Sequence, residues 1–242
     1  MAVTGTGMIM TTGIITMITE PGLHALLAWT SPSYPVGAFS YSHGLEQAVE
    51  AGEVTDRATL VAYVSAVIDR GGGWVDLVLF AHGWRAAGDA DAFDEIADIA
   101  AAFRGSAETM LESRQMGSSF LSVTRRAWPH PALDALAVRR EGRPLAHCIA
   151  GALASAAHGV PLAPALTAWG HGIAANLVSA GVRLVPLGQT DGQIATAALA
   201  PLIAQAVARA SVTALDDLGT AAPLLEIASM RHETQYTRLF RS

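Results

Sequence analysis

The stretch Asp56–Arg70 reads DRATLVAYVSAVIDR and has the clearest structural pattern in the sequence. Its apolar residues recur at intervals of three and four, so they share one face of an α-helix. The residues on this face are Leu60, Val64, Val67 and Ile68. Asp56 is a residue type that caps helix starts, and three glycines after Arg70 favour a helix end. The stretch therefore predicts an amphipathic helix with one buried face.

Helical periodicity extends over much of the remaining chain. One further helix is expected to bend or break near Gly117, and another to follow a capping box of Thr190 and Gln193. Strand-like alternation is scarce, and Pro186 argues against a central strand at residues 182–187. We predict an all-α, single-domain bundle of roughly nine or ten helices. The further helices are expected over residues 74–87, 89–103, 106–127 and 194–215.

The first 19 residues carry no charge and could be mistaken for a signal peptide. They lack its basic start, and glycine and threonine interrupt their apolar run. We expect residues 1–19 to be a disordered leader, with Met8, Met10 and Met17 as alternative starts. Residues 20–225 are then the helical domain, and residues 226–242 a C-terminal docking tail.

A second uncharged stretch, residues 144–182, is long enough to raise a membrane-span alternative. Pro161 and Pro164 divide it, and its many alanines and glycines insert weakly into bilayers. We expect two small-residue helices packed closely in a bundle, and no membrane span.

Composition restricts the classes of function. Charged residues make up only 15% of the chain, so we expect partner proteins to cover part of its surface. The net charge is −6 and no basic run exists, which argues against nucleic-acid binding. All 15 basic residues are arginines. Without lysine the chain can form neither a Schiff base nor a Walker-type phosphate loop, so any nucleotide must be bound by a partner.

A search for catalytic and metal motifs finds little. The G-x-S-x-G frame is absent around Ser40 and Ser42, and the eight histidines show no metal-ligand spacing. Cys148 is the only cysteine; it indicates a reducing compartment, here the cytoplasm, and we interpret it as a small buried apolar residue. The sequence thus favours a binding or assembly role without catalytic, metal or cofactor residues of its own.

Four segments resemble one family. Residues 31–46, SPSYPVGAFSYSHGLE, are similar to the N-terminal signature of UreF, and residues 112–121, ESRQMGSSFL, to its central helix. Residues 180–193, AGVRLVPLGQTDGQ, and residues 226–242, EIASMRHETQYTRLFRS, resemble its two later signatures. The resemblance runs in order from about residue 23 to residue 242.

The resemblance implies an all-helical, dimerising, non-enzymatic urease maturation factor. Such a protein bridges UreD, also called UreH, and the GTPase UreG, and it acts on apo-urease. Nickel and GTP with magnesium are then handled by the assembly and the partner GTPase. The missing lysine agrees with this, because the nucleotide would bind in the partner.

The tail is the strongest candidate for a docking segment. Residues 230–242 carry a formal charge of +2 on an acidic chain, together with aromatic residues typical of interfaces. Their apolar side chains are poorly suited to hang free in solvent. We expect the tail to order against UreD or the dimer mate. The residues expected to contact partners are Tyr41, Ser42, His43, Arg231, His232, Tyr236, Arg238 and Phe240.

Two other readings stay open beside the membrane alternative. One is a stand-alone nickel-binding metallochaperone, which would bind nickel tightly by itself. The other is a hydrolase that uses Ser40 or Ser42 with a distant histidine and aspartate, and a covalent serine probe would label it.

Overall fold

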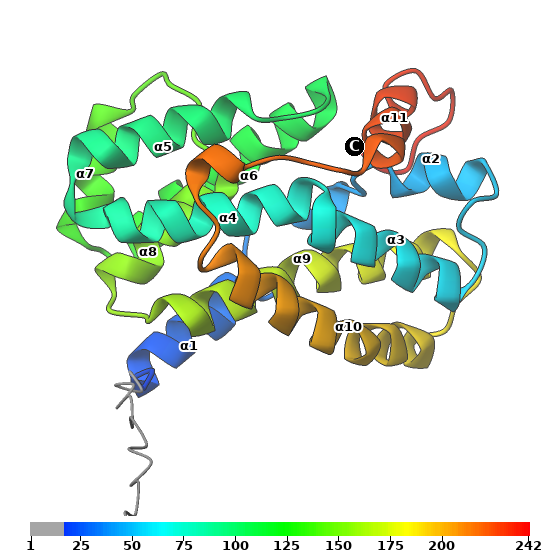
Figure 1. Cartoon of the computed structure of the whole chain (residues 1–242), viewed down its shortest axis with the longest axis horizontal. Coiled ribbons are helices and arrows are strands. Elements are labelled where there is room, and N and C mark those ends of the chain that lie inside the picture. The colour runs from blue at the N-terminus through cyan, green and yellow to red at the C-terminus, as the bar shows by residue number, and fades with distance from the viewer. Residues whose placement is uncertain (1–16) are drawn as a thin grey trace, which may run out of the picture.

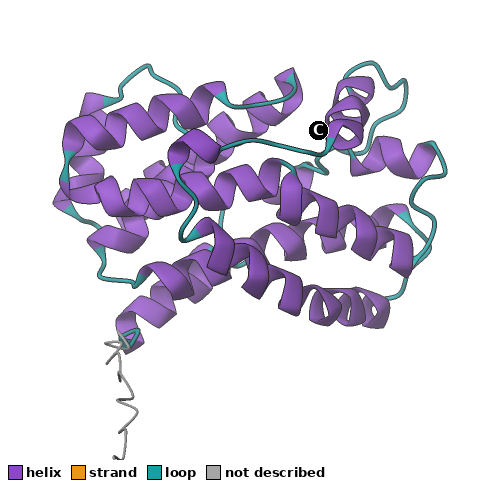
Figure 2. Ribbon diagram, in the orientation of Figure 1, coloured by secondary structure: helices purple, strands orange, loops and turns teal. Residues whose placement is uncertain are grey.

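The computed structural model describes residues 17–242, so most of the expected leader lies outside the described residues. Within this range every regular element is helical, which confirms the all-α class (Figure 2). The first half contains α1 (Glu20–Trp29), α2 (Leu45–Glu50), α3 (Arg57–Arg70), α4 (Gly72–Arg85) and α5 (Ala90–Ala102). The second half contains α6 (Ala107–Ala127), α7 (Pro131–Arg139), α8 (His147–Ala157), α9 (Leu162–Leu184), α10 (Gln189–Ala210) and α11 (Pro223–His232). Short 3-10 helices cover Ala38–Ser40, Ala86–Gly88 and Leu215–Asp217.

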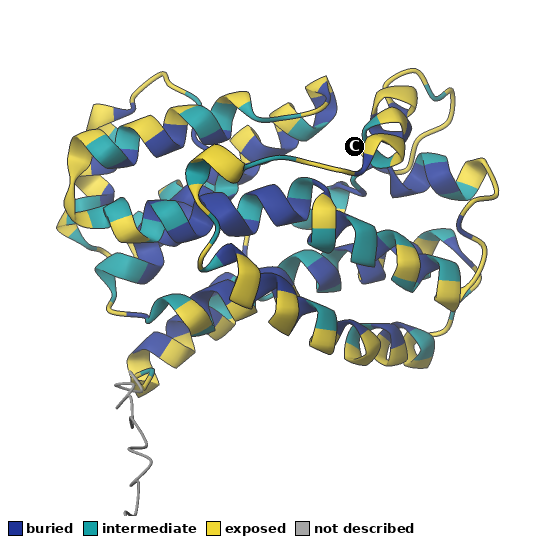
Figure 3. Cartoon of the chain, viewed as in Figure 1, coloured by how far each residue is buried: buried dark blue, intermediate teal, exposed yellow. Residues whose placement is uncertain are grey.

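Helix α4 lies at the centre of the bundle (Figure 1). It contacts α3, α5, α8, α9 and α10, and its side chains Leu77, Leu79 and Phe80 are fully buried. Figure 3 shows the outer helices with one exposed side each and the middle of the bundle buried. The predicted stripe on α3 is confirmed as core, because Leu60 and Val64 are also fully buried.

The uncharged stretch folds into α8 and α9, two helices rich in small residues, as predicted. Small residues let their neighbours approach closely: a Cβ on Gly151 would lie 2.3 Å from the ring of Trp169. None of the helices between residues 17 and 242 is both long and apolar enough to cross a bilayer.

Helices α3 and α6 each begin directly after a capping residue in the sequence. Asp56 caps α3 and Ser106 caps α6, each accepting a backbone N–H three residues on. The expected break near Gly117 is wrong, because α6 is continuous from Ala107 to Ala127. Gly117 instead makes room for the chain before α8, since a Cβ there would lie 2.1 Å from the carbonyl oxygen of Leu145.

The expectation for α10 is wrong at both ends. The helix begins at Gln189, where the Asp191 carboxylate accepts the Gly188 N–H at 3.4 Å, so Thr190 lies inside the first turn. It ends at Ala210, and the chain then passes into a separate 3-10 turn that includes Leu215.

The last segment of the chain returns to the first. Helix α11 lies beside α2 and the start of α6, and the C-terminus ends against this group (Figure 1). The expected boundary at residue 226 falls inside α11, so the tail is continuous with the helix that packs it on the bundle.

Candidate functional site

The tail is held by the segment that precedes α2. The N–H of Arg241 donates to the carbonyl of Ser40 at 2.8 Å, and the N–H of Ser42 donates to the backbone oxygen of Ser242 at 2.6 Å. The Ser42 hydroxyl donates to the same oxygen. These bonds fix residues 240–242 along the N-terminal signature segment. We call this joint between tail and body the clasp, and it comprises residues 40–46, Glu108, Glu112, Arg183 and residues 229–242.

Gly44 lets α2 reach the tail. Gly37 has a φ of +79° and Gly44 has a φ of +76°. Both angles are left-handed, a conformation that favours glycine. A Cβ on Gly44 would lie 2.7 Å from the backbone nitrogen of Ser229. Glycine at this position therefore provides both the turn into α2 and the close contact with α11.

Glu46 is the buried acceptor for the tail backbone. Its side chain is only 8% exposed, and its two oxygens accept the N–H groups of Leu239 at 2.6 Å and Phe240 at 2.9 Å. A buried carboxylate needs such donors, because it has lost its hydration. The backbone N–H groups of the tail thus replace hydrogen bonds to water that the Glu46 carboxylate loses on burial.

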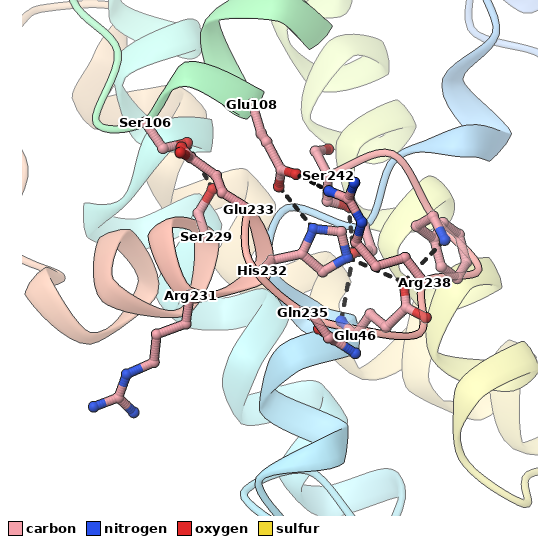
Figure 4. A network of polar contacts seen from close by, with 12 residues as sticks. Glu46, Ser106, Glu108, Ser229, Arg231, His232, Glu233, Gln235, Arg238 and Ser242 are labelled. Carbon is pink, nitrogen blue, oxygen red and sulfur yellow. Dashed lines mark hydrogen bonds and ion pairs between the residues drawn. The ribbon is translucent and has the colours of Figure 1, made fainter.

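His232 sits between two carboxylates (Figure 4). Nδ1 lies 2.7 Å from Glu108 Oε2 and Nε2 lies 3.1 Å from Glu46 Oε2, and the ring is fully buried. The ring therefore links an acid of α2 to an acid of α6. Arg238 adds a cation to Glu108, at 2.7 Å. Two buried acids are thus contacted by two side chains of the tail.

Glu112, one turn after Glu108, joins the tail to the body at a second point. It accepts the Ser242 hydroxyl at 2.9 Å and lies 3.2 Å from Nδ1 of His43. Burial alone would lower the pKa of His43, but the carboxylates of Glu112 and Asp76 together raise that pKa above its ordinary value.

Arg183, on α9, contacts both the tail and the N-terminal signature segment. Its guanidinium lies 4.4 Å from the centre of the Phe240 ring and donates to the Phe39 carbonyl at 3.0 Å. An arginine next to apolar residues thus has a backbone carbonyl as its hydrogen-bond partner. These contacts also mean that all four distinctive sequence segments meet in one place, although they are far apart in the chain.

The structure divides the eight predicted site residues into two groups. Tyr41, Ser42, His232 and Phe240 are buried against the chain's own helices, and His43 is 21% exposed beside Glu112. The remaining three, Arg231, Tyr236 and Arg238, are exposed. The buried group positions the tail, and the exposed group lies on its outer side. Their expected contact with partners stays a prediction.

Sequence reasoning missed the three glutamates that receive the tail. Glu46 ends one quoted signature and Glu112 begins another, while Glu108 lies one helical turn before Glu112. Their spacing of four places Glu108 and Glu112 on one face of α6, but exposed acids show the same spacing. The signal that could have found them is the surplus of arginine and histidine in the tail, which needs acidic partners once it is buried.

Candidate metal ligands and the single cysteine were compared with the sequence-based expectations. Between residues 17 and 242, no group of three or more His, Cys, Asp and Glu side chains is arranged to hold a metal ion. Cys148 is fully buried, as expected, and burial raises the pKa of its thiol well above the ordinary value. A protonated, buried thiol is a poor nucleophile.

The fold and the clasp define a class: an all-helical, single-domain protein whose tail is fixed to its bundle by a buried ionic network. The UreF family model matches residues 54–200. A urease accessory protein UreF from Rhodopseudomonas palustris (strain BisB5) is 50% identical over 222 residues, 91% of each chain. One from Granulibacter bethesdensis is 49% identical over 225 residues, 92% of this chain and 95% of its own. The chain belongs to the UreF family, which confirms the resemblance of its four segments.

Proposed function

We propose that this chain is a non-enzymatic urease maturation factor of the cytoplasm. The relatives named urease accessory protein UreF align with this chain over almost their whole length. The structural support is that the four segments resembling the family meet at the clasp rather than at a catalytic constellation. Such an arrangement suits a protein that presents a fixed surface to others.

The maturation role comprises three contacts. The chain bridges UreD, or UreH, and the GTPase UreG, and it supports GTP-dependent nickel insertion into apo-urease. Nickel, GTP and magnesium are handled by the assembly and the partner GTPase. The absence of lysine supports this division, because a nucleotide loop cannot be built from this chain. The working unit in this proposal is a homodimer.

The docking surface is the outer side of the clasp. Tyr236 is fully exposed and Leu239 is 66% exposed, and Phe39, which immediately precedes the clasp in the chain, is also 66% exposed. Arginine and aromatic residues are enriched among residues that dominate binding energy. This exposed set is the observation that carries the proposal, because large apolar side chains held on a rigid support lose little entropy when a partner covers them.

Single substitutions on this surface test the proposal. In a pull-down with cognate UreD, Tyr236→Ala and Leu239→Ala should each weaken binding by roughly 10-fold or more, as expected for interface hot spots. The matched control is Val212→Ala, because Val212 is 84% exposed but follows α10, away from the tail. Unchanged binding by both tail variants would show that UreD does not dock on this surface.

A further inference from the structure

A cavity of about 140 Å³ lies beneath the N-terminal signature segment. Helices α4, α6 and α9 and residues 29–43 supply most of its wall. Pro32 and Phe39 belong to this wall and are exposed, so the cavity opens to the surface beside them. A molecule from solution can therefore enter it.

Two carboxylates line the cavity, and each uses only one of its oxygens within the protein. Arg104 donates to Oδ1 of Asp76 at 2.8 Å. The Ser242 hydroxyl donates to Oε2 of Glu112 at 2.9 Å, and Nδ1 of His43 lies 3.2 Å from the same atom. Among residues 17–242, these contacts leave Oδ2 of Asp76 and Oε1 of Glu112 without an N–H or O–H donor.

These two free oxygens remain accessible. The Asp76 side chain is 17% exposed and the Glu112 side chain 8%, and neither free oxygen is fully buried. A carboxylate with so little exposure has lost most of its hydration, and each of its oxygens needs a donor. A molecule that fits the cavity must therefore bring hydrogen-bond donors.

The charge of the wall favours a cation. Asp76 and Glu112 bring two negative charges, and Arg104 brings one positive charge. His43 adds a second positive charge only while its ring is protonated. His147 is neutral at pH 7, because burial lowers its pKa to about 4. The wall is thus neutral or negative, and a primary ammonium group has the three N–H donors that the free oxygens need.

Much of the remaining wall is apolar, which favours an alkyl chain over a cluster of water. The apolar side chains are Val36, Phe39, Met116, Ile173 and Leu177. Ligand sites combine such apolar walls with a few placed polar groups. An engineered 150 Å³ cavity in another protein holds one benzene molecule, so this volume suits a ligand of roughly six non-hydrogen atoms.

We propose that this cavity binds a primary ammonium group carried on a short carbon chain. The ammonium donates to the free oxygens of Asp76 and Glu112, and the chain packs against Met116. A free alkylamine and the lysine side chain of a partner protein share this chemistry, and this chain itself has no lysine. n-Butylammonium reproduces a lysine side chain and serves as the probe. Its binding does not depend on the proposed maturation role, because the cavity is formed within one chain.

The methyl ¹H–¹³C resonance of Met116 reports on the site directly, because Met116 lines the cavity. Titration of the full chain with n-butylammonium chloride should shift this resonance, which is assigned through Met116→Leu. The Met110 resonance should stay in place, because Met110 lies on the same helix outside the cavity wall. Sodium chloride at equal ionic strength is the salt control. No shift of the Met116 resonance up to tens of millimolar probe would overturn the proposal.

The charge is tested on the ligand and on the protein. Butan-1-ol, a neutral analogue, should bind about 10-fold more weakly than n-butylammonium, the effect of a charged hydrogen bond. Asp76→Asn keeps an acceptor for Arg104 and should weaken n-butylammonium binding by about 10-fold, while butan-1-ol binds as before. The matched control is Asp134→Asn, since Asp134 pairs with Arg125 on the surface, outside the cavity wall. Equal affinity of both variants for n-butylammonium would overturn the proposal.

Filling the cavity tests where the probe binds. Gly172 lines the cavity, and a Cβ there meets no atom closer than 3.8 Å, so Gly172→Leu has room for its side chain. This variant should lose probe binding, whereas Thr167→Leu, at an exposed position of the same helix, should keep it. Binding of the probe to Gly172→Leu with native affinity would contradict the site.

Nα-acetyl-lysine methylamide distinguishes the two sources of the ammonium group. Binding as tight as that of n-butylammonium would support a partner's lysine, and binding of n-butylammonium alone would support a free amine. Failure of both ligands to bind would overturn the site and leave the proposed docking to UreD untouched, because the pull-down measures that docking separately.

Discussion

At the scale of single residues, His232 connects the two halves of the clasp. It is the only side chain of the tail that contacts two different buried glutamates, Glu46 on α2 and Glu108 on α6. Both carboxylates keep other donors, but each loses its contact with the imidazole if the ring is removed. The residue is therefore expected to matter first for the stability of the tail and only then for binding.

The variant His232→Leu should lower the free energy of unfolding by about 3–5 kcal/mol, because it removes a hydrogen-bonding partner from two buried acids at once. Chemical denaturation measures this directly. The control is His24→Leu at an exposed position of α1, which should change stability by less than about 0.5 kcal/mol. A loss below about 1 kcal/mol at His232 would contradict the ionic network described here.

The buried His147 imidazole should make the free energy of unfolding depend on pH. Burial lowers the pKa of its imidazole from 6.5 to about 4, so the folded chain holds the ring neutral while the unfolded chain protonates it. A depressed histidine pKa means that stability is complete above pH 6.5 and falls as pH drops toward 4. The loss from this group should approach about 3 kcal/mol at pH 4.

The measurement compares unfolding free energies at pH 7 and pH 4.5 for the chain and for His147→Phe. Phenylalanine keeps an aromatic ring beside Phe120 and Trp169 without the titrating group. The difference in unfolding free energy between pH 7 and pH 4.5 should be smaller for the variant than for the native chain. An unchanged difference would show that the buried ring does not resist protonation.

At the scale of elements, the contact between α2 and α11 depends on Gly44. Gly44→Ala places a methyl group 2.7 Å from the backbone of Ser229 and also strains a φ of +76°. Gly52 is a matched control, since its φ is +75° but nothing lies within 4 Å of its Cβ position. Gly52→Ala should cost about 1–2 kcal/mol from strain alone.

Gly44→Ala should cost roughly twice as much, because α11 must also move. Limited proteolysis should then cut the variant between α11 and the C-terminus, where both the native chain and Gly52→Ala resist. Equal stability and equal protease resistance of the two variants would show that the close contact is unimportant.

Elements with local signals were predictable from sequence. Helices α3 and α6 begin directly after their capping residues, Asp56 and Ser106. These starts can be predicted because a capping residue is adjacent in sequence to the first turn that it caps. The start of α10 was misplaced, since several polar residues near Gly188 could serve as its cap. Gly117 was misread as a break because its role depends on a backbone carbonyl at Leu145, which only the tertiary structure brings near.

At the scale of the whole molecule, sequence reasoning identified the four distinctive segments but not their meeting point. His232 and Phe240, which were expected to contact partners, lie buried against the chain's own helices, and their contact with partners stays a prediction. The donors of the tail and the acceptors Glu46, Glu108 and Glu112 are more than 100 residues apart. No local pattern can connect them, so the clasp and the cavity beside it follow only from the assembled fold.

The nickel content of urease tests directly whether this chain matures urease. The cognate urease and its other accessory proteins are expressed with nickel, with and without this chain, and metal is measured on the purified enzyme. We expect nickel-poor urease without the chain, full loading with the native chain, and poor loading with Tyr236→Ala. Equal nickel content with and without the chain would contradict the claim.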